Sequence, residues 1–82
     1  MCFSIDKVWL NLSNRRDRLK FNRLSCQCEG DVVIKDGNFG INAKSRLMME
    51  NIDLPEPVLV EFYGEIPHNV KKHIKKLIEG MQ

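Results

Sequence analysis

The sequence lacks any apolar run near the roughly 20 residues that a helix needs to cross a bilayer, which excludes a transmembrane segment from our expectations. Its first residues contain no basic segment followed by an apolar stretch, so we expect no secretory signal. Its three cysteines are an odd number and form no evident disulfide framework. Together these absences predict a cytoplasmic protein, because the cytoplasm keeps thiols reduced.

The chain also has few ligands for a metal centre. A closed zinc site usually takes four ligands, and Cys2, Cys26 and Cys28 would have to recruit His68 or His73 to supply them. Cys28 fits the apolar side of a helix better, where a thiol packs as a small hydrophobic group. We therefore expect no metal and no cofactor. No Ser/His/Asp or paired-carboxylate arrangement stands out, so we also expect no enzyme activity.

Net charge is small as well, at +2 for the whole chain. The charges are nevertheless segregated, because residues 15–23 and 71–76 are basic and residues 50–65 are mostly acidic. Nucleic-acid binding favours aromatic side chains among the basic ones, whereas Phe62 and Tyr63 lie apart from both basic clusters. The composition therefore argues against a nucleic-acid partner.

The length predicts a single domain over residues 1–82 with a small core. Alternating apolar residues indicate half-buried strands near 8–12 and 39–43, and Lys35-Asp36-Gly37-Asn38 is typical of a hairpin turn. Helical spacing predicts an amphipathic helix over 15–28 and a short helix after Ser45. A last helix carries an apolar stripe of Val70, Ile74, Leu77, Ile78 and Met81.

These elements alternate in the order strand, helix, strand, strand, helix, strand, helix. Strands paired by a hairpin, with helices that must cover one face, predict an α+β open-faced sandwich. Ser45 stands at the start of the short helix, where its hydroxyl can accept a hydrogen bond from a free backbone N–H group. The same position favours negative charge, so Ser45 is also a candidate phosphoacceptor.

The block Ile41-Asn-Ala-Lys-Ser45 and the segment Ile52-Asp-Leu-Pro-Glu-Pro-Val58, in this order of elements, resemble the HPr family. HPr proteins are the histidine-containing phosphocarriers of the sugar phosphotransferase system. The likeness runs from about Asp6 to Met81 and is most specific around Ala43-Lys44-Ser45. It implies a four-stranded antiparallel sheet with three helices on one face.

In that family, a histidine in a Gly-x-His-Ala-Arg-Pro loop between the first strand and the first helix carries the phosphoryl group. Here the junction reads Leu12-Ser-Asn-Arg-Arg-Asp-Arg-Leu19 and has no histidine, glycine or proline. Phosphoryl carriage needs a nucleophilic imidazole at a helix N-terminus. The resemblance therefore implies a divergent bacterial member with a degenerate site and no carrier activity.

Ser45 matches, by position, a serine that a dedicated kinase phosphorylates in many members of the family. Arg46 and Glu50 depart from the apolar pattern that follows this serine in the family, and so change the docking surface for such a kinase. Both interpretations of Ser45, as a helix cap and as a phosphoacceptor, therefore stay open.

Our leading hypothesis is a non-enzymatic regulatory or protein-binding module in the control of sugar uptake, a monomer or a weak homodimer. Its partner would be a phosphotransferase-system component or a transcription regulator. The alternatives are a working phosphocarrier with an unconventional acceptor and a small nucleic-acid-binding domain. A protein partner or a phosphorylated small molecule would meet a surface made by the first helix and the Ser45 helix: Asn14, Arg15, Arg16, Arg18, Lys44, Arg46, Leu47 and Met48.

Overall fold

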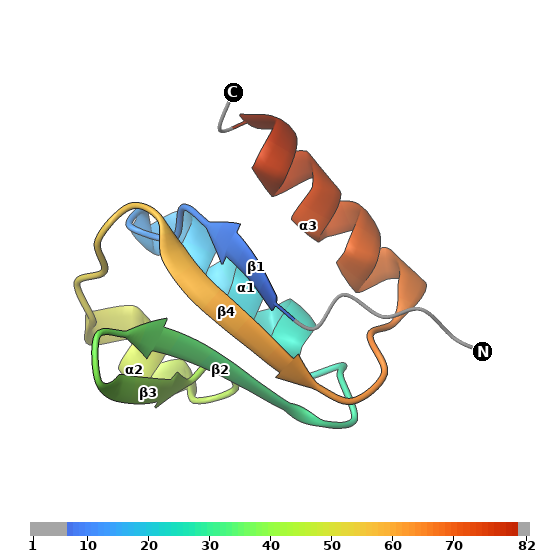
Figure 1. The fold of residues 1–82 in the computed structure, drawn as a ribbon, viewed down its shortest axis with the longest axis horizontal. Helices are drawn as coiled ribbons and strands as arrows, with labels where there is room; N and C mark the ends of the chain where they lie inside the picture. Colours follow the sequence, from blue (N-terminus) through green and yellow to red (C-terminus); the bar gives the residue numbers. More distant parts are fainter. Residues whose placement is uncertain (1–6, 81–82) are drawn as a thin grey trace.

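The computed structural model describes residues 7–80, which form a four-stranded sheet and three helices (Figure 1). Asp6, Met81 and Cys2, which entered the predictions above, lie outside the described residues. The elements follow one another as β1 (Lys7–Leu10), α1 (Arg15–Ser25), β2 (Asp31–Asp36), β3 (Phe39–Asn42), α2 (Arg46–Asn51), β4 (Val58–Tyr63) and α3 (His68–Gly80).

The sheet has the strand order β1-β4-β2-β3, and all neighbouring strands are antiparallel. Its register places Val8, Val60, Ile34 and Ile41 in one row across the four strands. Side chains alternate between the faces of a strand, so this row lies on a single face, and three of its members are buried. The helices cover one face of the sheet (Figure 1). The predicted α+β open-faced sandwich is therefore confirmed.

The core lies between this face of the sheet and the helices. Phe21 of α1 meets Phe62 of β4 edge to face, with ring centroids 6.3 Å apart. Met49 of α2 and both Val70 and Ile74 of α3 are fully buried against the same core. Each helix thus contributes its apolar stripe, which is the arrangement that the helical spacing predicted.

Helix α1 is shorter than predicted, because it ends at Ser25 rather than at residue 28. The backbone N–H groups of Gln27 and Cys28 donate to the carbonyls of Leu24 and Ser25, three residues back. This tighter pattern is common where an α-helix ends. Cys28 is buried as predicted, but it follows the helix instead of lying on it.

Helix α3 is the longest of the three, with 13 residues. Val70 and Ile74 are buried along its apolar stripe, while Lys72, Lys75 and Lys76 are exposed. Within residues 7–80, no helix combines the length and the apolar character needed to span a bilayer.

Candidate functional site

The junction between β1 and α1 is capped by its own side chains. Asn14 precedes α1, and its Oδ1 accepts hydrogen bonds from the backbone N–H groups of Arg16 (2.8 Å) and Asp17 (3.4 Å). The hydroxyl of Ser13 donates to the carboxylate of Glu56. Amides of this kind bind phosphate at many helix N-termini, but here two of them already have an acceptor within the chain. The charged residues that line the hollow beside the junction are two carboxylates, Asp17 and Glu56, and one cation, Lys76.

The prediction that Arg18 belongs to the partner-binding surface is wrong, because its side chain is buried. Only 5% of its surface is exposed. Its Nε donates to the carbonyl of Met49 (3.0 Å), and its Nη1 donates to the carbonyls of Leu12 (3.4 Å) and Ser13 (2.5 Å). The guanidinium group, with its fixed fork of donors, therefore joins the β1–α1 junction to the end of α2.

The position of Arg18 on α1 could have indicated its burial, although the cluster of basic residues suggested an exposed side chain. Arg18 shares one side of α1 with Phe21, Asn22 and Ser25, at spacings of three and four residues, and all four are buried. Asn22 donates from Nδ2 to the carbonyl of Ala43 (2.8 Å), just before α2 begins. Neither polar contact can be predicted from spacing alone, because each depends on a carbonyl contributed by a distant segment.

Helices α1 and α2 run in opposite directions. Arg18, near the start of α1, bonds to Met49 near the end of α2, whereas Cys26, just after α1, donates its thiol to the carbonyl of Lys44 just before α2 (3.6 Å). The predicted site residues are therefore divided between two places. Asn14, Arg15 and Arg16 are exposed at one end of the helix pair, and Lys44 and Arg46 lie at the other.

Ser45 caps α2, as one interpretation of the sequence predicted. Its Oγ accepts a hydrogen bond from the backbone N–H of Met48 (3.3 Å), and its carbonyl accepts one from the N–H of Met49 (3.0 Å). The residue is half-buried. Capping accounts for a serine here without any modification, and its use as a phosphoacceptor stays a prediction.

The two cations flanking Ser45 both have partners within the chain. Lys44 donates from Nζ to the carbonyl of Cys28 (2.8 Å). Arg46 pairs with Glu50 one turn later on α2, with Nε 2.8 Å from Oε1. The Arg46 side chain is largely exposed, so this pair remains open to exchange with a partner.

The outward side of α2 is apolar. Leu47 is 74% exposed and Met48 is 44% exposed, whereas Met49 is fully buried. A two-turn helix can bury only part of this set. Flexible methionine side chains adapt to varied partners, so Leu47 and Met48 with Arg46 form the α2 surface considered below.

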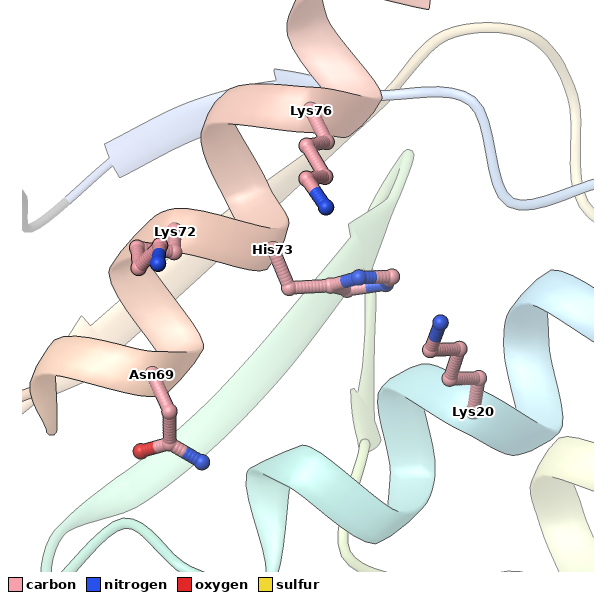
Figure 2. A pocket seen from close by; sticks show the side chains of 5 residues that line it. All are labelled: Lys20, Asn69, Lys72, His73 and Lys76. Carbon is pink, nitrogen blue, oxygen red and sulfur yellow. The ribbon is translucent and has the colours of Figure 1, made fainter.

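Neither histidine of the described chain lies at the β1–α1 junction. His68 begins α3 and is exposed. His73 lies between α3 and the middle of α1, where it shares a hollow with Lys20 (Figure 2). Further along the same groove, Asn69 donates to Oε1 of Gln27 just beyond α1 (2.7 Å). The two helices are therefore antiparallel, with His73 about two turns from the capped junction.

The environment of His73 favours its neutral form. Burial lowers the pKa of the imidazole, and the positive charge of Lys20 lowers it further. Asp17 acts in the opposite direction, and Lys76 adds to the lowering. The Nε2 atom is buried and has no hydrogen-bond partner among residues 7–80.

The cysteines form no metal centre in the part of the chain that the structure covers. Cys26 and Cys28 are both free thiols, the first exposed and the second buried. Burial raises the pKa of Cys28, although the positive charge of Lys44 opposes the shift. No cluster of three or more histidine, cysteine or acidic side chains suited to a metal ion occurs among the described residues. Cys2, which completed the metal interpretation, lies outside them.

Comparison with known proteins supports the fold. A solved structure described as HPr-C-His from Thermoanaerobacter tengcongensis is similar over 93% of each chain, with a TM-score of 0.67 and 18% sequence identity. At that identity the similarity shows an HPr-like fold and assigns no role to individual residues. No family model matches the chain, and no curated protein matches it.

Proposed function

We propose that this chain is a divergent HPr-like module of the bacterial cytoplasm, a single domain over residues 1–82, that binds a protein partner and carries no phosphohistidine. The junction between β1 and α1 supports this proposal most directly. The side chain of Asn14 already accepts hydrogen bonds from two backbone N–H groups that would otherwise be available to a phosphoryl group. In the hollow beside it, two carboxylates, Asp17 and Glu56, outnumber the single cation Lys76 and disfavour a bound phosphate. The nearest imidazole, on His73, lies about two turns away along α1.

The partner is proposed to meet the α2 surface, where Leu47 and Met48 expose apolar area next to the charge of Arg46. Apolar anchors supply affinity in such contacts, while the surrounding charges set specificity and the rate of association. Arg15 and Arg16 are exposed at the start of α1, at the other end of the α1–α2 pair from Arg46. They would engage acidic residues at the edge of the surface of a large partner. A phosphotransferase-system component or a transcription regulator controlling sugar uptake is the proposed class of partner, and the module acts as a monomer or a weak homodimer.

The carrier prediction can be tested with the general phosphotransferase enzyme and labelled phosphoenolpyruvate. We expect no acid-labile label on this chain, because neither described histidine lies at the capped junction. An active HPr treated in parallel is the positive control and should be labelled to completion. Acid-labile label on this chain would contradict the proposal.

A working phosphocarrier with an unconventional acceptor is the second candidate, and His73 is the observation that favours it. A neutral imidazole beside Lys20 and Lys76 has a free electron pair and nearby positive charge. The same labelling experiment with His73→Asn separates the two functions. Label that disappears in this variant would establish His73 as the acceptor.

The α2 surface can be tested by titrating the isotopically labelled chain with the general phosphotransferase enzyme. We expect nuclear magnetic resonance shifts centred on Leu47 and Met48, and an affinity loss of at least about tenfold for Leu47→Ser, because a buried leucine anchor is worth about 1.5–3 kcal/mol. Phe39→Ser is the matched control, since Phe39 on β3 is equally exposed at 74%. A larger loss for Phe39→Ser would place the contact on the hairpin instead. Absence of binding would remove this enzyme from the proposed partners.

A further inference from the structure

The groove between α1 and α3 contains a small basic hollow that the proposed protein contact does not use. It has a volume of about 240 Å³. Figure 2 shows the side chains of Lys20 from α1 and Lys76 from α3 extending toward the imidazole ring of His73 from opposite sides. The remaining lining side chains are Asn69 and Lys72.

The lysines of this hollow form no salt bridge among the described residues, although Lys76 also lines the neighbouring hollow with Asp17 and Glu56. None of the lining residues is acidic. Over residues 7–80, the lysine and arginine side chains that pair with a carboxylate are Lys7 and Arg46, and neither belongs to this hollow. Asp17 is the acid that influences His73, and it lines the neighbouring hollow at the junction. Ammonium groups held near one another repel, so an anion between them would relieve an unfavourable arrangement.

We propose that this hollow binds a phosphate-type dianion, free or as the phosphate group of a small phosphorylated molecule, through Lys20, Lys72 and Lys76 with His73 at its floor. Its volume falls below the range of about 300–1,000 Å³ typical of pockets for drug-sized ligands. A small anion therefore suits it better than a large organic ligand. The amide of Asn69 offers a neutral donor at one end.

The protonation of His73 gives this binding a specific signature. In the free protein, burial and the charges of Lys20 and Lys76 lower the pKa of the His73 imidazole, and Asp17 opposes them. A dianion in the hollow would offset most of the lysine charge and attract the imidazolium form of His73. Binding must therefore raise the pKa of His73, and protonation of His73 must tighten binding by the same free energy.

The lowered pKa of His73 should also make the folding stability of the free protein depend on pH. The pKa of His73 is lower in the folded than in the unfolded chain, so the unfolded chain takes up the proton first as the pH falls. Folding stability should therefore decrease as the pH drops through about 6.5, the unfolded value. Bound phosphate should reduce or abolish this decrease.

The experiment measures the pKa of His73 by nuclear magnetic resonance, from the chemical shifts of its ring protons between pH 5 and pH 8. Chloride keeps the ionic strength constant. Inorganic phosphate and glycerol 3-phosphate are the two ligands, and sulfate serves as a dianion whose charge is constant over this range. We expect saturable binding and an increase in the pKa of His73 with each dianion. The double variant K20Q/K76Q should lose at least about tenfold in affinity for phosphate, or about 1.4 kcal/mol, because it removes two of the three positive charges that line the hollow.

The control variant K35Q/K75Q removes the same charge from two exposed lysines that do not line the hollow. It should bind phosphate within about twofold of the natural chain, since neither ammonium group lines the hollow and exposed charges are screened by salt. Tighter binding of glycerol 3-phosphate than of inorganic phosphate would identify the ligand as a phosphorylated molecule, whereas equal affinity would identify free phosphate. Equal losses in both double variants, or a pKa of His73 that saturating phosphate leaves unchanged, would overturn the proposal. Binding of a single-stranded oligonucleotide without binding of either phosphate would overturn it as well.

Discussion

Replacing Gly30 with alanine is expected to leave most of the chain unfolded at room temperature. The added Cβ would overlap the backbone carbonyl of Tyr63 and lie 3.1 Å from the Cα of Gly64. Both neighbours belong to the backbone at the end of β4, next to the Asp31–Tyr63 pair of the two central strands. They cannot rotate away as a side chain would, so the ends of β2 and β4 must separate. We expect a loss of at least about 4 kcal/mol, comparable with the entire stability of a domain of this size.

Chemical denaturation followed by circular dichroism measures this loss. Gly80→Ala is the matched control, because a Cβ at Gly80 meets no atom within 4 Å at the end of α3. That change should be neutral or slightly stabilising, since alanine favours helix more than glycine does. Equal denaturation midpoints for Gly30→Ala and the natural chain would show that β2 and β4 do not approach each other as described.

Replacing Arg18 with alanine is expected to cost about 3 kcal/mol, because carbonyl groups of Leu12, Ser13 and Met49 would lose a charged donor in a buried place. The vacated volume adds to this cost. Arg18→Lys should recover only part of it, since a single ammonium group lacks the planar fork that reaches both the junction and α2. The free energy of unfolding and hydrogen exchange of the α2 amides report the two effects.

Arg16→Ala provides the comparison for Arg18, because Arg16 is exposed two residues earlier on the same helix. Its free energy of unfolding should change by no more than about 0.5 kcal/mol. If binding to a partner depended on Arg18 while stability did not, the buried guanidinium would have to be a surface group after all. That result would restore the original prediction from the sequence.

The sequence predicted the elements well because their signals are local. The alternation through Ile34 and Ile41, and the turn between them, depend on residues adjacent along the chain. Ser45 could be placed at a helix start for the same reason, since its hydroxyl bonds to an amide three residues ahead. The end of α1 was predicted too late because the helical spacing of apolar residues continues to Cys28, while tighter turns after Ser25 already close the helix.

The candidate site was harder to predict, because charge patterns do not show which cations the fold encloses. Arg15, Arg16 and Arg18 look alike along the sequence, yet only Arg18 points toward the carbonyl of Met49. The set expected to form one surface is instead divided by the antiparallel packing of α1 on α2. Such assignments require the relative positions of two helices, which no pattern within either helix contains.

The amino-acid sequence by itself determined the order of strands and helices, the cap at Ser45, and the absence of an imidazole from the β1–α1 junction, since each depends on neighbours a few residues apart. Only the tertiary structure decided that Arg18 is enclosed and that His73 faces Lys20. The physical reason is that both outcomes arise where separate helices pack on the sheet, and the packing brings together groups distant in the chain.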